Sequence, residues 1–281
     1  MRKQEWIVAM FVIFVLSVLS FFSGESSDDL KVWIFFKDRG YVKFNGANAI
    51  QQVHFSKKAI ERRQVRGLQS WSETDQAVDP AYISQVKAAG AQVFVVSRWL
   101  NAVSAKCNSN CRAKLAKLNF VSEIRPVATY IQSRVVEKRE VSISRNVHFA
   151  KATSDEFDYG PSRQQLDEIN VIDAHRKGFA GQGETVAIFA DGFLRDHIAF
   201  KDHDILEERN FVTGEHGKGS CGGSSVTVGT ATWSIFGGET PGKLYGPSFK
   251  SKVILAATDL IGDEPRTEED NWVAAFEWAD Q

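Results

Sequence analysis

The order of short apolar segments constrains the fold of this chain more than any other feature. Apolar runs typical of strands alternate with longer segments of helical periodicity. Strands are expected over residues 32–36, 92–96, 102–105 and 120–130, and helices over 81–89 and 111–118. This β-α-β-β-α-β order predicts a ferredoxin-like α+β sandwich with both helices on one face. An additional basic helix is expected over 56–66.

The pattern changes after residue 162. Helices are expected over 165–177, 228–236 and 269–279, and strands over 185–189, 205–211 and 253–257. Strands that alternate with helices favour a parallel sheet covered on both faces. The last helix should begin at Thr267-x-x-Asp270, with acids in its first turn. The fold class is therefore α/β, preceded by an α+β domain.

Charge divides the chain at the same place. The formal net charge is −1, but residues 31–135 carry 17 basic and 6 acidic side chains (+11), and residues 151–281 carry 12 basic and 23 acidic ones (−11). The basic helix at 56–66 lacks interleaved aromatic residues, which favours a solvated or docking face over a nucleic-acid site. No nucleic-acid partner is expected.

The N-terminus has the features of an export signal. Arg2 and Lys3 precede an apolar run over 6–22, and polar residues follow. We expect a signal peptide over 1–24 and a secreted, periplasmic or cell-surface protein. The alternative is an uncleaved membrane anchor over 6–22, because Phe21 and Phe22 occupy the place of a small-residue cleavage site.

The cysteines and polar loops offer weaker signals. Cys107 and Cys111 either form a local disulfide or remain two thiols, since a zinc site needs two further ligands. Cys221 has no neighbouring histidine that would mark a nucleophile. A solvated polar loop is expected for Asp196, His197, Asp202, His203 and Asp204. No metal is therefore expected at either place. No dinucleotide cofactor is expected, because Gly181-x-Gly183 precedes its strand and lacks a third glycine.

Several segments together resemble the subtilisin-like serine peptidases of family S8. Residues 186–193 followed by His197, and 228–232 leading into a helix, resemble the family's Asp-(Thr/Ser)-Gly strand end and its His-Gly-Thr helix start. Residues 33–37, 59–67 and 97–104 resemble the inhibitor-type propeptide that precedes such domains. The resemblance implies a partial three-layer subtilisin-like sheet over 161–281, a propeptide-like domain over 31–135 and a linker over 136–160.

The resemblance also implies where catalytic side chains should lie, and the sequence departs from it there. The family's Asp falls at Ala190 and its His at Val228. Weak substitutes are Asp191, which alternation along the strand would point to the opposite face, and His216, which does not open a helix. The region of the Ser nucleophile is not present before Gln281. We therefore expect no intact catalytic residue.

Three hypotheses remain open. The chain is an exported, proteolytically dead homologue whose propeptide-like half docks on its own peptidase-like half. Alternatively, the propeptide-like half inhibits or chaperones an intact subtilisin-like peptidase. In the third, the chain is the leading fragment of an active peptidase. Because the family's next strand is absent, we also expect an exposed apolar sheet edge and a marginally stable second domain.

Overall fold

The computed structural model describes residues 29–40, 55–128, 157–223, 226–259 and 268–281. They form two compact units: the first contains 29–40 and 76–126, and the second contains 55–75, 127–128 and the described residues from 157 onward. The segment expected to be a signal or anchor, with most of the predicted linker, lies outside these ranges. None of the helices in the described ranges is long and apolar enough to span a bilayer.

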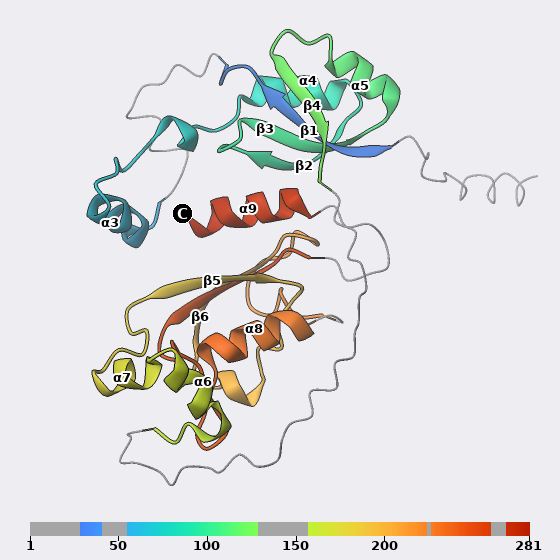
Figure 1. Cartoon of the computed structure of the whole chain (residues 1–281). Helices are drawn as coiled ribbons and strands as arrows, with labels where there is room; N and C mark the ends of the chain where they lie inside the picture. Colours follow the sequence, from blue (N-terminus) through green and yellow to red (C-terminus); the bar gives the residue numbers. More distant parts are fainter. Residues whose placement is uncertain (1–28, 41–54, 129–156, 224–225, 260–267) are drawn as a thin grey trace, which may run out of the picture. The chain divides into compact units, whose positions relative to one another are not determined.

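The first unit is the predicted ferredoxin-like sandwich (Figure 1). Its elements are β1 (Leu30–Phe36), α4 (Pro80–Ala88), β2 (Gln92–Ser97), β3 (Ala102–Cys107), α5 (Ser109–Leu115) and β4 (Val121–Pro126). The strands form an antiparallel sheet in the order β2-β3-β1-β4. Alternate residues of β1, Val32, Ile34 and Phe36, are buried with Val86 of α4 and Leu115 of α5. Both helices therefore share one face of the sheet, as the apolar pattern indicates.

Polar side chains fix the ends of these elements. Asp79 caps α4 by accepting a hydrogen bond from the Ala81 backbone N–H at 2.8 Å. Asn108 caps α5 through the Cys111 N–H at 2.9 Å, and Cys107 and Cys111 form a disulfide across this helix start. Of the two sequence-based alternatives for these cysteines, the structure contains the disulfide. The helix ends three residues earlier than the predicted 118.

The second unit holds a parallel sheet with helices on both faces. Its elements are α3 (Lys57–Val65), η1 (Glu73–Asp75), η2 (Gly160–Ser162), α6 (Arg163–Glu168), α7 (Val171–Arg176), β5 (Thr185–Ala190), η3 (Ile198–Phe200), β6 (Asp204–Asn210), α8 (Thr227–Gly237), β7 (Glu239–Thr240), β8 (Leu244–Tyr245), β9 (Lys252–Ala257) and α9 (Glu269–Ala279). Within the described residues the sheet order is β5-β9-β6, all parallel. Figure 1 shows α8 and α9 on opposite sides of this sheet.

Successive residues of β5 explain the two layers. Ile188 is buried with Trp233 of α8, whereas Phe189 packs edge-on against Trp272 and Phe276 of α9, with ring centroids 5.7 and 4.7 Å away. Opposite orientation of neighbouring side chains is the geometry of a strand buried on both faces. The predicted parallel sheet is thus confirmed, and β5 is an edge strand among the described residues.

The structure differs locally from the expected elements, most clearly in the helix over 165–177. The helix expected over 165–177 is two short helices, because Asn170 adopts a left-handed conformation (φ 59°) between them. The N-cap of α9 is Glu268 and Asp270 is fully buried, while Thr267, with which the sequence predicts the helix to begin, lies outside the described residues. The hairpin formed by β7 and β8 was not expected, since each strand has only two residues.

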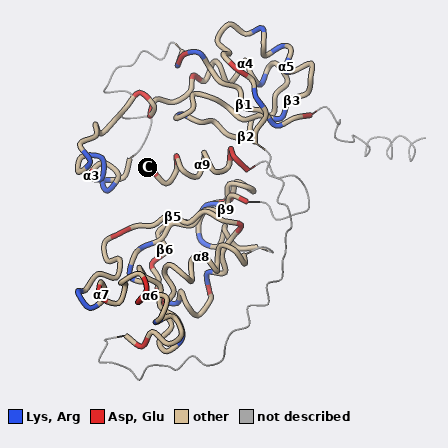
Figure 2. Tube along the Cα trace, in the orientation of Figure 1, with Lys and Arg blue, Asp and Glu red and all other residues tan. Residues whose placement is uncertain are grey.

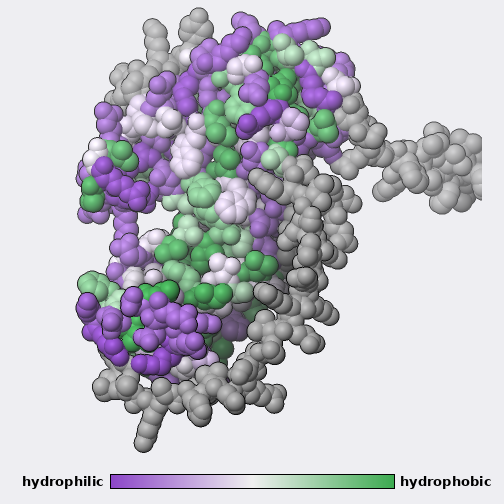
Figure 3. All heavy atoms as spheres, in the orientation of Figure 1, coloured by the Kyte–Doolittle hydropathy of each residue, from purple (hydrophilic) through white to green (hydrophobic). Residues whose placement is uncertain are grey.

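Charge and hydropathy follow the elements. Lys and Arg residues gather on α3, and Asp and Glu residues lie at the start of α9 (Figure 2). On the visible face, hydrophilic residues also cover α6 and α7 (Figure 3). The opposite faces of these two helices are apolar: Leu166 of α6 and Ile172 of α7 are buried in a cluster with Tyr245 and Phe249, apart from the core about the sheet.

Candidate active-site junction

The end of β5 meets the start of α8, and this junction brings together the two positions singled out in the sequence. A Cβ atom built on Gly229 would lie 3.0 Å from the Cβ of Ala190 and 2.1 Å from the carbonyl oxygen of Gly192. Only glycine permits such close approach of a helix to a strand end. The backbone therefore places Ala190 beside the first turn of α8, where Val228 lies.

Neither residue brings a titratable group to the junction. Ala190 is buried, with 4% of its surface exposed, whereas Val228 is 59% exposed. A methyl group and an isopropyl group can neither hold nor transfer a proton. The resemblance predicts that these two positions lie close together, and their proximity is consistent with it. Their assignment to catalytic positions stays a prediction.

Asp191 lies at the same junction. Its carboxylate accepts hydrogen bonds from the backbone N–H groups of Gly229 at 2.8 Å and Val228 at 3.4 Å. Negative charge at a helix N-terminus is stabilising because the first N–H groups have no intrahelical partner. Because β5 ends at Ala190, the alternation of a strand does not extend to Asp191, which instead holds α8 in place.

The neighbouring hydroxyl and thiol groups are also held by backbone. Thr230 accepts a hydrogen bond from the Leu194 N–H at 2.8 Å and donates to the carbonyl of Val226. The Cys221 thiol faces the carbonyl oxygens of Arg209 and Leu255 at 3.2 and 3.4 Å. Burial raises the pKa of this thiol, so the thiolate needed for nucleophilic attack is disfavoured.

His216 lies away from any helix start. It forms an isolated antiparallel bridge with Arg209 in the connection between β6 and α8, and its side chain is exposed. The same connection is fixed by Glu208, whose carboxylate accepts from the Gly219 N–H at 2.8 Å and pairs with Arg195. The structure describes no contact that brings His216 to Ala190 or Asp191.

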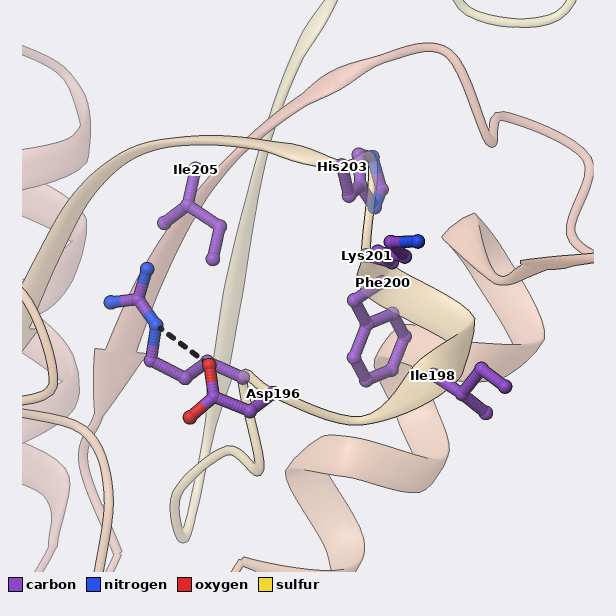
Figure 4. A pocket seen from close by; sticks show the side chains of 7 residues that line it. Asp196, Ile198, Phe200, Lys201, His203 and Ile205 are labelled. Carbon is purple, nitrogen blue, oxygen red and sulfur yellow. Dashed lines mark ion pairs between the residues drawn. The ribbon is translucent and has the colours of Figure 1, made fainter.

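A cavity of about 440 Å³ lies beside η3 and the start of β6 (Figure 4). Its lining comes from Arg195, Asp196, Ile198, Phe200, Lys201, His203 and Ile205. Arg195 pairs with Asp196 at 3.9 Å and with the buried Glu208, so its charge is largely compensated. This cavity therefore has only Lys201 as an exposed cation without a carboxylate partner among the described ion pairs.

The polar loop residues around this cavity form hydrogen bonds and ion pairs with neighbouring elements. His197 caps η3 through the Ala199 N–H at 3.2 Å, and Asp204 pairs with Lys252 at 2.7 Å. His203 accepts a hydrogen bond from the Trp233 indole at 2.8 Å, and burial lowers its pKa. The expectation of a uniformly solvated loop is wrong for His203, because α8 covers it. Within the described ranges no three metal-ligating side chains gather.

A second cavity, of about 530 Å³, lies along α9. It is lined by Asp259, Glu268, Glu269, Trp272, Val273 and Phe276. Asp259 is oriented by hydrogen bonds from the Thr258 hydroxyl at 2.8 Å and the Trp272 indole at 3.2 Å. Aromatic rings with carboxylates at their rim suit an apolar or cationic side chain. The sequence pattern gave no signal for this cavity, since its walls come from separate segments.

Comparisons with known proteins identify a propeptide family in the first part of the chain and a similar fold among solved structures. Residues 31–143 match the model of the peptidase S8 propeptide domain of Bacteroidota. Fervidolysin from Fervidobacterium pennivorans, a keratinolytic enzyme related to subtilisin, has a similar fold, with a TM-score of 0.52 and 13% identity over 89% of this chain. The match covers 34% of the fervidolysin chain, so this chain spans about a third of its length.

Two structures of the epidermin leader peptide processing serine protease from Staphylococcus aureus are also similar, each at 13% identity. The S393A mutant gives a TM-score of 0.47 and covers 86% of this chain and 45% of that one. The other structure gives 0.45 and covers 86% and 44%. No curated protein sequence matches the chain significantly.

Proposed function

We propose that this chain, which is a relative of the subtilisin-like S8 peptidases and carries an S8 propeptide domain, is an exported homologue without proteolytic activity of its own. The observation that carries the proposal is the junction of β5 and α8. Its backbone is closely packed, but the positions that the resemblance assigns to the catalytic Asp and His are Ala190 and Val228.

The proposed loss of activity has a chemical reason. A serine peptidase needs an imidazole that takes the proton of the nucleophile and a carboxylate that orients this imidazole. General acid–base catalysis contributes about 10²- to 10⁴-fold, and without it the hydroxyl is not activated. Asp191 alone does not replace these groups, because a carboxylate cannot supply the missing imidazole, and its described hydrogen bonds are those of a cap at the start of α8.

Export is supported by two observations. The propeptide family that matches residues 31–143 suggests a secreted peptidase. The Cys107–Cys111 disulfide is of a kind that persists in oxidising compartments. We propose that residues 1–24 direct export, with retention of residues 6–22 as a membrane anchor the alternative. Fractionation followed by N-terminal sequencing distinguishes the two, and a full-length reduced protein in the cytosol would contradict export.

Activity is tested with the full 281-residue chain and a fluorescent casein substrate, with a subtilisin as the positive control. We expect no hydrolysis above buffer, and none after Ala190→Asp combined with Val228→His, because no Gly-Thr-Ser sequence is present in the chain. Hydrolysis by the native chain that is lost in Asp191→Asn or His216→Ala would overturn the proposal and identify the substitute residue.

A second candidate function is binding in trans. The propeptide half has a complete four-stranded sandwich with its own apolar core and disulfide. We propose that it can inhibit, or assist the folding of, an intact subtilisin-like peptidase. The test adds the full chain at micromolar concentration to such a peptidase. Unchanged hydrolysis and unchanged refolding yield of the peptidase would exclude this function.

A further inference from the structure

The basic helix α3 is anchored on the end of α9. Arg63 donates two hydrogen bonds to the Asp75 carboxylate, at 2.7 and 3.2 Å, and a third to Asp280 at 2.5 Å. Its guanidinium also lies over the ring of Phe55, 4.0 Å from the centroid. One arginine therefore joins α3, the η1 turn and the residue that ends α9.

These charges are largely removed from water. The side chain of Asp75 is 1% exposed, that of Arg63 12% and that of Asp280 23%. Ser72 supplies two further hydrogen bonds to Asp75, at 2.9 and 3.1 Å. Breaking a buried, hydrogen-bonded pair is costly because the remaining charge is left uncompensated. Asp75 thus positions Arg63 toward Asp280 and makes the contact specific.

The end of α9 needs such a partner. Its last turn contains no basic residue, although the free carbonyl groups of a helix end favour cations. Arg62 supplies one by donating to both the carbonyl oxygen and the carboxylate of Asp280, each at 3.0 Å. The Ser56 N–H donates to the carbonyl of Gln281. Residues 55–75 therefore complete the polar end of α9.

The position of residues 55–75 in the sequence shows which two parts of the chain this contact joins. Residues 55–75 lie inside the stretch that matches the propeptide family, 31–143. They nevertheless belong to the second unit, where Arg62 and Arg63 donate hydrogen bonds to Asp280. Residues 76–126 of the first unit follow them directly. The segment is therefore propeptide sequence that is folded onto the peptidase-like half.

We propose that residues 55–75 are a docking element that holds the propeptide half to the peptidase-like half through the Asp280 end of α9, independently of the covalent connection over 129–156. The partner surface is an acidic helix end, and the recognising groups are Arg62 and Arg63, with Asp75 as the positioning residue. The proposal does not depend on whether the chain hydrolyses peptides, so a proteolytically active chain would leave it intact.

The test uses the full chain with a site for a sequence-specific protease inserted between Lys138 and Arg139. After cleavage, the two fragments are followed by size-exclusion chromatography, and their dissociation rate is measured on a sensor surface. We expect the native fragments to co-elute. Asp280→Arg and Arg63→Glu should each speed dissociation at least tenfold, the first because it faces Arg62 with a like charge and the second because it leaves Asp75 opposite a like charge.

Lys57→Ala is the matched control. Its side chain is 92% exposed, and its ion pair within the described part of the chain is with Glu61 of the same helix, at 3.8 Å, so dissociation should not change. Because Arg63→Glu can prevent folding, Asp280→Asn provides a milder variant at the helix end, for which we expect a smaller increase in rate. Unchanged dissociation in Asp280→Asn and Asp280→Arg, or native fragments that separate at once, would overturn the proposal.

Discussion

Both units are closely packed, but they differ in the side chains that lie where their elements meet. In the first unit α4 and α5 cover one face of the sheet and enclose one apolar core. Polar side chains accept hydrogen bonds from backbone N–H groups at the start of both helices. The second unit packs the junction of β5 and α8 just as closely, yet the side chains at that junction are Ala190, Val228 and an engaged Asp191. Packing is therefore close in both units, whereas the titratable side chain among these three junction residues, Asp191, accepts hydrogen bonds from the start of α8.

The largest expected effects come from core truncations, which test whether each unit depends on its own core. Trp233 of α8 is fully buried and stacks on Phe200 with ring centroids 3.7 Å apart, and Leu115 of α5 is fully buried in the first unit. We expect Trp233→Ala to destabilise the second unit by about 3–5 kcal/mol and Leu115→Ala to destabilise the first by about 2–5 kcal/mol.

Hydrogen exchange resolved by peptide measures these losses separately. Each variant should increase exchange in its own unit much more than in the other. A uniform increase across both units in either variant would show that the two cores unfold together, and the comparison of independent units would fail.

Gly229→Ala tests the close packing of the junction. The added methyl group would meet the Gly192 carbonyl oxygen, which is backbone and cannot rotate away. We expect a loss of about 1–3 kcal/mol from the overpacked site, measured by chemical unfolding. Val228→Ala, at the adjacent exposed position, is the control and should change stability by less than about 0.5 kcal/mol. Equal effects of both variants would contradict the close approach.

Asp191→Ala tests whether the carboxylate at the junction is structural. Loss of the hydrogen bonds to Gly229 and Val228 should cost about 0.5–2 kcal/mol, as for other residues that cap helices. Asp191→Asn keeps an acceptor oxygen and should retain most of the stability. If Asp191→Ala proves neutral in urea unfolding, the capping role is wrong.

The smallest expected effect is on acid stability. Although burial opposes ionisation of Asp75, hydrogen bonds from Arg63 and Ser72 outweigh it, and its pKa is held below the ordinary value of 3.8. A hydrogen bond from Tyr82 likewise lowers the pKa of Asp38 in the first unit, but that carboxylate is exposed. Since both pKa values are lower in the folded protein, both contributions are present above pH 3.8 and are lost as the pH falls below it.

The two units should therefore differ in acid. We expect the stability difference between the native chain and Asp75→Asn to be constant from pH 5 to 7 and to shrink below about pH 4, with a smaller change for Asp38→Asn. Unfolding midpoints measured across this range check it. A difference for Asp75→Asn that already changes between pH 5 and 7 would contradict the assigned direction.

Most of the secondary structure could be predicted because it is encoded locally. The apolar pattern located β5, β9 and α9 to within a residue or two, because short apolar runs mark buried strands and a repeat every three or four residues marks a helix. It failed at Asn170, where a single left-handed residue breaks a helical pattern. It also failed for the two-residue strands β7 and β8, which are too short to show a repeat.

Only part of the candidate junction could be predicted from the sequence. The sequence indicated that Ala190 and Val228 replace the expected Asp and His, but the engagement of Asp191 by α8 depends on where β5 ends and how the helix approaches. His203 shows the same limit. Its neighbour Trp233 is 30 residues away in sequence, so local polarity suggested solvent where the fold placed an indole.

The sequence by itself determined the order of strands and helices, the opposite charges of the two halves and the residue types at the junction, because each is a property of neighbouring or individual residues. Only the tertiary structure decided that residues 55–75, within the propeptide sequence, fold with the second unit. The contact from Arg63 to Asp280 spans 217 residues of chain. Breaking it would leave a largely buried charge without compensation, which no local pattern records.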